Sequence, residues 1–213
     1  HELFEIEVLK DLGKAGFLGS LVFAGGTMLR LCHDLPRYSA DLDFWFSRKV
    51  AYDQFHKKLL AFCKDAYDLT DAQNKHFTLL YEFRGKTFPR KLKIEIRKEI
   101  IRTDIEDKIA YSKYGSIQVL VRALSLDEMA RRKLLAISER SEIRDYFNLE
   151  FLFRRGVLIG LSQKNKELLK GRIDRFEQRD YSVVLGSLLE KGLRDYYVKN
   201  KFSYLLERIN QNN

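Results

Sequence analysis

Hydrophobic positions near the start of the chain change their spacing at a pair of glycines. Residues 21–24 (Leu-Val-Phe-Ala) form a continuous apolar run, which is typical of a short buried strand. Beyond Gly25 and Gly26, apolar residues recur at the spacing of one helical face: Met28, Leu31, Cys32 and Leu35. Pro36 cannot continue this helix. The pattern predicts a strand, a tight glycine turn, and a helix that begins near Thr27 and ends before Pro36.

The start of this predicted helix is a candidate anion site. Backbone N–H groups without a partner and the positive end of the helix dipole both favour a negative ligand there, such as a triphosphate. The glycines at 25 and 26 would let that ligand approach the main chain closely. The alternative is a simple chain reversal, because turns of this kind are common.

A second apolar stretch, residues 41–46, contains two aspartates at alternate positions. Alternate side chains of a strand share a face, so Asp41 and Asp43 point together while Leu42 and Phe44 enter a core. Two adjacent carboxylates repel each other unless a cation lies between them. Mg²⁺ favours carboxylate and phosphate oxygens, so the pair is a candidate magnesium site. The alternative is an edge strand with two solvated aspartates.

A third carboxylate follows from the same alternation. Residues 77–84 and 91–96 are two β-type runs joined through glycine and proline, which predicts a long hairpin. Leu92, Ile94 and Ile96 share one face of the second run, and Lys93, Glu95 and Arg97 share the other. If the polar face adjoins Asp41 and Asp43, Glu95 supplies the third ligand of a two-metal site, with ions ~4 Å apart. The alternative is a surface hairpin with alternating charges.

The remaining pattern predicts an α+β protein with two domains. An amphipathic helix passes through Phe55, Leu59, Phe62 and Cys63, and a charged linker is expected from Arg102 to Lys113. Alternation at residues 117–121 predicts a strand, and the capping box of Ser125 and Glu128 predicts a helix beginning at Leu126. Everything after that residue has helical spacing. We therefore expect an α/β core with a mixed sheet at residues 1–124 and a helical domain at residues 125–213.

Two charged residues fall on apolar helical surfaces of the second domain. Lys133 lies within a stripe of apolar residues and needs either a partner, such as a polyphosphate, or a path along which its amine reaches solvent. The predicted helix at residues 143–154 is apolar on nearly every side and should be buried. Asp145 on that helix is expected to be paired, with Arg144, Lys133 or a water molecule as candidate partners.

Composition and charge narrow the classes of function. The 213 residues are 45% hydrophobic and 13% aromatic, which indicates a globular protein. A net charge of +9 and a pI near 9.4 favour a polyanionic partner. Basic residues outnumber acidic ones between positions 131 and 155, which suits a triphosphate or an RNA backbone, although a solvated helix face would have the same pattern.

Several other classes are disfavoured. The sequence contains no G-x-S-x-G elbow, no HExxH and no P-loop, so a serine hydrolase, a zinc enzyme or a P-loop NTPase would lack its usual residues. No apolar stretch approaches the ~20 residues of a membrane span, and no secretory signal is visible. Cys32 and Cys63 are expected as reduced core residues. We expect a cytoplasmic protein without a membrane partner.

The motifs resemble those of a known family. Residues 25–31 (Gly-Gly-Thr-Met-Leu-Arg-Leu) and 37–44 (Arg-Tyr-Ser-Ala-Asp-Leu-Asp-Phe) are similar to the signature of the AbiEii/AbiGii-type nucleotidyltransferase toxins. Lys133, followed by Arg140, Arg144, Asp145 and Tyr146, is similar to the later motif of that family. One departure is Asn148, which stands where the family usually has an aspartate. The motifs cover roughly residues 20–155.

The resemblance implies a polymerase-β-like nucleotidyltransferase core followed by a helical domain. It implies a nucleoside triphosphate (NTP) substrate, Mg²⁺ with Mn²⁺ as an alternative, a tRNA acceptor, and a toxin with a cognate antitoxin, in a toxin–antitoxin or abortive-infection system. The implied metal ligands are Asp41, Asp43 and Glu95, and Lys133 and Asp145 would complete the catalytic residues from the second domain. The implied nucleotide contacts are Gly25, Gly26, Thr27, Arg37, Ser39 and Lys133.

Two other functions stay open at this stage. The same core could transfer a nucleotide to a protein hydroxyl or to a small molecule such as an aminoglycoside. A basic RNA-binding module without catalysis would also have this charge. We expect the catalytic form to depend on Asp41 and Asp43 and the binding module to be indifferent to them.

Overall fold

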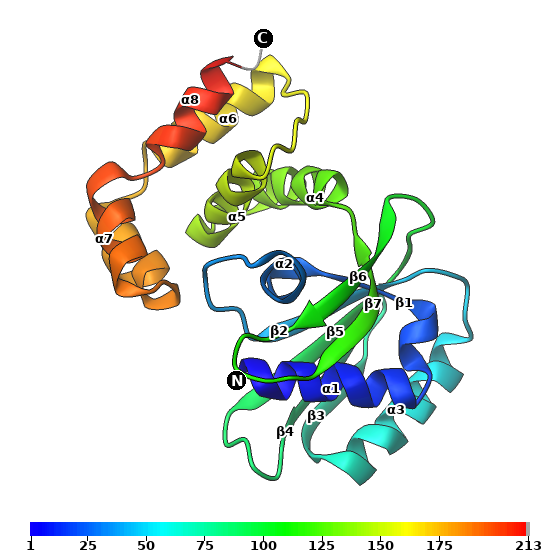
Figure 1. Ribbon diagram of the computed structural model, residues 1–213. Coiled ribbons are helices and arrows are strands. Elements are labelled where there is room, and N and C mark those ends of the chain that lie inside the picture. The colour runs from blue at the N-terminus through cyan, green and yellow to red at the C-terminus, as the bar shows by residue number, and fades with distance from the viewer. Residues whose placement is uncertain (212–213) are drawn as a thin grey trace. The chain divides into compact units, whose positions relative to one another are not determined.

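The computed structural model describes residues 1–211, which form two compact units (Figure 1). The first unit comprises residues 1–34 and 39–125, and the second comprises residues 35–38 and the chain from Leu126 onward. The expected division is a single boundary between residues 124 and 125, whereas residues 35–38 are grouped with the second unit. This short segment belongs to the helical unit because, for example, the Tyr38 N–H donates to the Leu188 carbonyl at 2.8 Å.

The first unit is built on a seven-stranded mixed sheet with strand order β3-β4-β5-β2-β1-β7-β6. Its strands are β1 (Leu21–Ala24), β2 (Asp41–Phe46), β3 (Asp68–Asn74), β4 (Thr78–Arg84), β5 (Lys91–Ile100), β6 (Ile105–Tyr111) and β7 (Gln118–Leu124). β2 runs antiparallel to β1 and parallel to β5, and β1 runs parallel to β7. The predicted hairpin is the antiparallel pair of β4 and β5. The expected α+β core with a mixed sheet is confirmed.

Helices α1 (Glu2–Lys14) and α3 (Tyr52–Ala66) cover one face of this sheet (Figure 1). On that face Phe46 of β2 packs against Phe55 of α3, with ring centroids 5.1 Å apart, and Phe83 of β4 packs against Phe4 of α1 at 6.1 Å. Leu42 and Phe44 of β2 are fully buried, as the alternation predicted. The charged residues of β2 and β5 therefore occupy the opposite face.

The helix α2 (Gly25–His33) begins at the first glycine rather than near Thr27. It ends at His33, where Asp34 takes a left-handed conformation with φ of +59°, so the chain has already left the helix before Pro36. The 3₁₀ helix η1 (Phe17–Ser20) leads into β1.

The expected linker from Arg102 to Lys113 is wrong, because residues 105–111 form β6 and pair antiparallel with β7. β3, which the pattern did not predict, pairs with β4. Both strands lie at the edges of the sheet. Charged side chains are common on edge strands because they discourage pairing with other chains, and they also hide the alternation that identifies a strand.

The second unit is helical, as expected. It contains α4 (Leu126–Glu139), α5 (Ile143–Arg154), α6 (Gln163–Ile173), the π-helix η2 (Asp180–Leu185), the 3₁₀ helix η3 (Gly186–Leu188), α7 (Lys191–Asn200) and α8 (Ser203–Gln211). α4 begins at Leu126 and α5 spans residues 143–154, as predicted. α5 is the most buried of these helices, since ten of its twelve residues are buried. No helix within residues 1–211 is both long enough and apolar enough to cross a lipid bilayer.

A buried acid lies on α1. The Glu5 side chain is 1% exposed, and neither of its carboxylate oxygens has a hydrogen-bond partner within the described part of the chain. Burial, together with the nearby charges of Glu2 and Asp41, raises the pKa of Glu5 to about 8. An acid with a raised pKa stays protonated in the folded protein at pH values where the unfolded chain has already lost the proton.

The sign of the resulting pH dependence follows from proton linkage. Between about pH 4.5 and pH 8 the folded state binds more protons at Glu5 than the unfolded state, so the free energy of unfolding falls as pH rises. We expect Glu5→Gln to be more stable than the wild type above about pH 8, with the difference shrinking towards pH 5. Thermal melting across this range measures the effect, and Glu7→Gln on the same helix is the control. Parallel curves for wild type and Glu5→Gln would contradict the assignment.

Candidate functional site

The turn from β1 into α2 is set by the backbone of Gly25. Ala24 is extended, whereas Gly25 has φ of +78°, a region that favours glycine because other residues have a Cβ. Gly26 and Thr27 follow in the first helical turn, where backbone N–H groups lack helical partners. The Thr27 side chain is fully buried, and its hydroxyl has no hydrogen-bond partner within residues 1–211.

Gly25 also lies directly against Asp43. The register pairs Ala24 of β1 with Asp43 of β2, which brings the turn and the carboxylate together. A Cβ at position 25 would overlap Asp43 Oδ2. The site therefore needs glycine here for two independent reasons, the backbone conformation and the space that Asp43 occupies.

The three predicted carboxylates lie on one face of the sheet. β2 and β5 are parallel neighbours in a register that pairs Asp41 with Lys93 and Asp43 with Glu95. Paired residues of adjacent strands point to the same side, so Asp41, Asp43 and Glu95 share a face. This is the arrangement on which the predicted metal site depends. Asp41 and Glu95 remain accessible, with side chains 42% and 28% exposed.

A lysine on the same face supplies the nearest positive charge. Lys93 Nζ lies 3.1 Å from Asp41 Oδ2 and 3.8 Å from Glu95 Oε2. Partial burial alone would lower the pKa of Lys93, but the hydrogen bond to Asp41 and the charges of Asp41, Glu95 and Asp43 raise it above its ordinary value. The alternation had placed Lys93 beside Glu95, but it gave no reason to assign it a role.

The donor set fits a hard divalent cation, although it is not closed around one. Carboxylate oxygens are the ligands that Mg²⁺ prefers, and the position of Lys93 Nζ shows that a cation is accommodated between Asp41 and Glu95. Within residues 1–211, no three Asp, Glu, His or Cys side chains are gathered tightly enough to hold a metal ion as they stand. The face supplies three carboxylates but not a finished coordination sphere.

The helical unit contains the other two predicted catalytic residues, and they bind each other. Asp145 is fully buried on α5; Lys133 Nζ donates to its Oδ1 at 2.8 Å and Arg140 Nε donates to its Oδ2 at 3.0 Å. Burial alone would raise the pKa of Asp145, but the charges and hydrogen bonds of Lys133 and Arg140 lower it. The expectation that Asp145 is paired is confirmed, with Lys133 as one partner. Arg144 instead binds Glu142 at 2.6 Å.

Arg37 and Ser39, two predicted nucleotide contacts, belong to different units. The buried Arg37 side chain lies in the helical unit, where its Nε donates to Asn148 Oδ1 at 2.8 Å and its Nη1 donates to the Tyr38 carbonyl at 2.7 Å. Asn148 is thus a neutral acceptor for Arg37. Ser39 immediately precedes β2 and lies in the sheet unit.

The chain matches a protein-family model described as "Nucleotidyl transferase AbiEii toxin, Type IV TA system" over residues 7–201. Among curated proteins, no sequence matches it. Its fold is similar to that of JHP933 from Helicobacter pylori, with 16% identity, coverage of 97% of this chain and 94% of that chain, and a TM-score of 0.56.

A second similar structure is MenT4, a nucleotidyltransferase toxin from Mycobacterium tuberculosis H37Rv. It is 16% identical, the match covers 96% of this chain and 82% of that chain, and the TM-score is 0.58. At such identities the two structures show a shared fold. The family match extends through both units, from within α1 to the end of α7. The protein therefore belongs to the AbiEii family of nucleotidyltransferase toxins of type IV toxin–antitoxin systems.

Proposed function

We propose that the protein transfers a nucleoside monophosphate from an NTP to an RNA, with tRNA as the acceptor, in a reaction that requires Mg²⁺ or Mn²⁺. The observation that carries this proposal is the register of β2 and β5, which gathers Asp41, Asp43 and Glu95 on one face. The choice of RNA is supported by the net charge of +9. The choice of tRNA rests on the family resemblance alone, and membership of the family implies a cognate antitoxin.

The predicted site residues of the sheet unit would have distinct roles in this reaction. Asp41, Asp43 and Glu95 would hold the divalent ion, which when bound offsets the charge that develops on the phosphate oxygens. The first turn of α2 would bind the phosphates through its free N–H groups, and the Thr27 hydroxyl would donate to a phosphate oxygen. Asp43 or Glu95 would accept the proton of the acceptor hydroxyl as that oxygen bonds to the α-phosphorus and pyrophosphate leaves.

The carboxylates are the direct test of the proposed reaction. We expect Asp41→Asn, Asp43→Asn and Glu95→Gln each to lower transfer at least about a hundredfold, because each removes charge that stabilises the transition state. Transfer is measured as labelled NMP incorporated from each of the four NTPs into total RNA and, separately, into protein. Glu99→Gln is the matched control. Glu99 lies on β5, as Glu95 does, but its carboxylate accepts a hydrogen bond from Trp45 Nε1 at 3.3 Å.

Other outcomes identify the alternatives. Label in the protein fraction alone would replace RNA by a protein acceptor, and label in neither fraction with full growth inhibition would favour a small-molecule acceptor. Growth inhibition that survives all three acid variants would leave a non-catalytic RNA-binding module.

The glycine turn gives a second test. We expect Gly25→Ala to lower transfer at least about tenfold, because its Cβ would displace the Asp43 carboxylate and strain the backbone by roughly 1–2 kcal/mol. Gly19→Ala is the control, since a Cβ there meets no atom within 4 Å. Transfer rates and melting temperatures of both variants are compared with the wild type. Normal transfer by a folded Gly25→Ala protein would contradict the close approach.

A role for Lys133 and Asp145 in catalysis is part of the proposal and can be separated from their structural role. Lys133→Met leaves the buried Asp145 charge with fewer partners, so we expect it to destabilise the protein by about 3 kcal/mol. In Lys133→Met/Asp145→Asn no buried charge is left uncompensated at position 145, so stability should recover. If Lys133 also binds the triphosphate, transfer stays low and KM for NTP stays high in this stable double variant. Recovery of transfer together with stability would restrict the pair to a structural role.

A further inference from the structure

The helical unit contains a pocket of about 270 Å³ between α5 and α7, which we call the α5–α7 pocket. Its walls are largely aromatic: Phe147 and Phe151 from α5, and Tyr196 and Tyr197 from α7. The rest of the lining is Arg154 at the end of α5, Leu193 of α7, and Pro36. The volume is below the ~300–1,000 Å³ of pockets that hold whole drug-sized ligands, so the space suits a single planar group.

The aromatic walls are held in place by their own packing. Phe147 and Tyr197 are almost fully buried, and their ring centroids lie 5.1 Å apart. Tyr196 packs edge-on against Tyr197 at 5.2 Å but remains 38% exposed. The pocket therefore has a fixed aromatic interior and one ring that a ligand can reach from solvent.

Arg154 is held by several contacts at once. Its Nε and Nη2 donate to Glu150 Oε1 at 3.0 and 2.9 Å, and Nη2 also donates to the Tyr196 hydroxyl at 3.2 Å. The guanidinium carbon lies 3.9 Å from the centroid of the Tyr204 ring. Glu150 is itself fully buried and accepts a hydrogen bond from the Tyr197 hydroxyl at 2.9 Å. This network leaves Arg154 Nη1 without a hydrogen-bond partner within residues 1–211, and the side chain is 41% exposed.

The surroundings of the pocket carry a further positive charge. The Arg155 guanidinium lies 5.1 Å from the centroid of the Phe151 ring, so a second cation flanks the aromatic wall. The one acid in the network, Glu150, is inaccessible to solvent. A ligand at the mouth of the pocket therefore meets the exposed Arg154 guanidinium, with Arg155 beside the aromatic wall, which favours an anionic molecule with a flat, uncharged ring.

We propose that the α5–α7 pocket binds an unpaired nucleobase of the acceptor RNA. Single-stranded bases are recognised by stacking on aromatic rings and guanidinium planes, with positive charge beside them for the backbone phosphates. The pocket supplies each of these parts: Tyr196 for stacking, Arg154 Nη1 for a hydrogen bond to a base edge, and Arg155 for a phosphate. The inference rests on the proposed function in one respect, that RNA is the acceptor.

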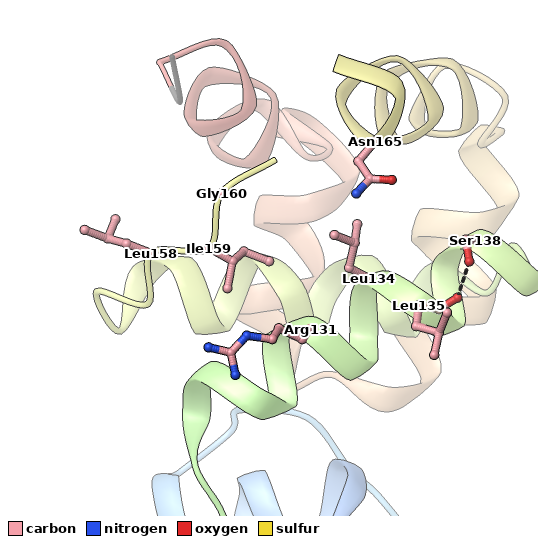
Figure 2. Close-up of a pocket in the computed structure, with 8 residues that line it drawn as sticks. All are labelled: Arg131, Leu134, Leu135, Ser138, Leu158, Ile159, Gly160 and Asn165. Carbon is pink, nitrogen blue, oxygen red and sulfur yellow. Dashed lines mark hydrogen bonds between the residues drawn. The ribbon is translucent and has the colours of Figure 1, made fainter. Parts of the chain in front are cut away.

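A second hollow in the same unit, of about 400 Å³, has no aromatic ring in its lining. Figure 2 shows it between α4 and residues 158–160, with Leu134, Leu135, Leu158 and Ile159 among its lining. Its aliphatic side chains share the lining with Arg131, Ser138 and Asn165, and none of its residues offers a ring for stacking. Its exposed Leu135 therefore provides a matched control in the same unit.

The test measures RNA binding without NTP, so its result does not depend on catalysis. The probe is a short RNA with one 2-aminopurine in an unpaired position, whose fluorescence falls when that base stacks. We expect wild type to quench the probe and Tyr196→Ala to bind it about 5- to 100-fold more weakly with little quenching. Tyr196→Phe should retain most of both effects because it keeps the ring, and Leu135→Ala should match the wild type. A fully paired duplex of the same sequence should bind wild type and Tyr196→Ala equally.

The outcomes separate the pocket from the proposed function. The proposal is overturned if folded Tyr196→Ala, checked by circular dichroism, quenches and binds the probe as wild type does, or if wild type does not bind the probe. RNA transfer that is normal in Tyr196→Ala would refute the pocket while leaving the transferase intact. Conversely, the wild type could transfer no nucleotide to RNA while Asp41→Asn still quenches the fluorescence of the probe. That result would support the pocket and refute the proposed reaction.

Discussion

The parallel register of β2 and β5 is the constraint on which the candidate site depends. It places Asp43 opposite Glu95 and Asp41 opposite Lys93, so three acids share a face that also contains one lysine. Like charges this close are unfavourable without a counter-charge, and Lys93 Nζ at 3.1 Å from Asp41 supplies part of it. Arg97, two residues beyond Glu95 on the same strand, adds a second positive charge to this face. The divalent ion of the proposed reaction would bind on this same face.

The turn before α2 places this charged face next to the N-terminal end of the helix, where the proposed reaction would bind phosphate. Asp43 pairs with Ala24, the last residue of β1, and its carboxylate occupies the space where a side chain on Gly25 would lie. A carboxylate and the first turn of a helix are thereby held within contact distance by backbone pairing rather than by flexible side chains. Geometry that is fixed by the main chain costs no reorganisation when a ligand arrives, which is the condition for effective electrostatic stabilisation.

Strands and helices with one buried face could be predicted from the sequence. The two strands at the edges of the sheet could not. The strand with Asp41 and Asp43, the hairpin with Glu95, and the helices at 126 and 143 alternate or repeat because one face of each is buried. β3 and β6 are held by hydrogen bonds to one neighbour, and their charged residues hid them. Within the site, the spacing identified the three carboxylates but not the roles of Lys93 or Arg140, because a lysine or arginine beside an acid is also common on solvated surfaces.

In the helical unit, buried acids are surrounded by basic side chains. The unit is rich in arginine and lysine, yet its central helix α5 contains two fully buried acids, Asp145 and Glu150. Each acid fixes cationic side chains in place: Asp145 holds Lys133 and Arg140, while Glu150 holds Arg154. Because a buried carboxylate is costly without partners, these pairs hold the cations in defined positions rather than letting them sample solvent. Three basic side chains of the helical unit are thereby held in fixed positions, although, within the described residues, the unit's other lysines and arginines are not held by these two acids.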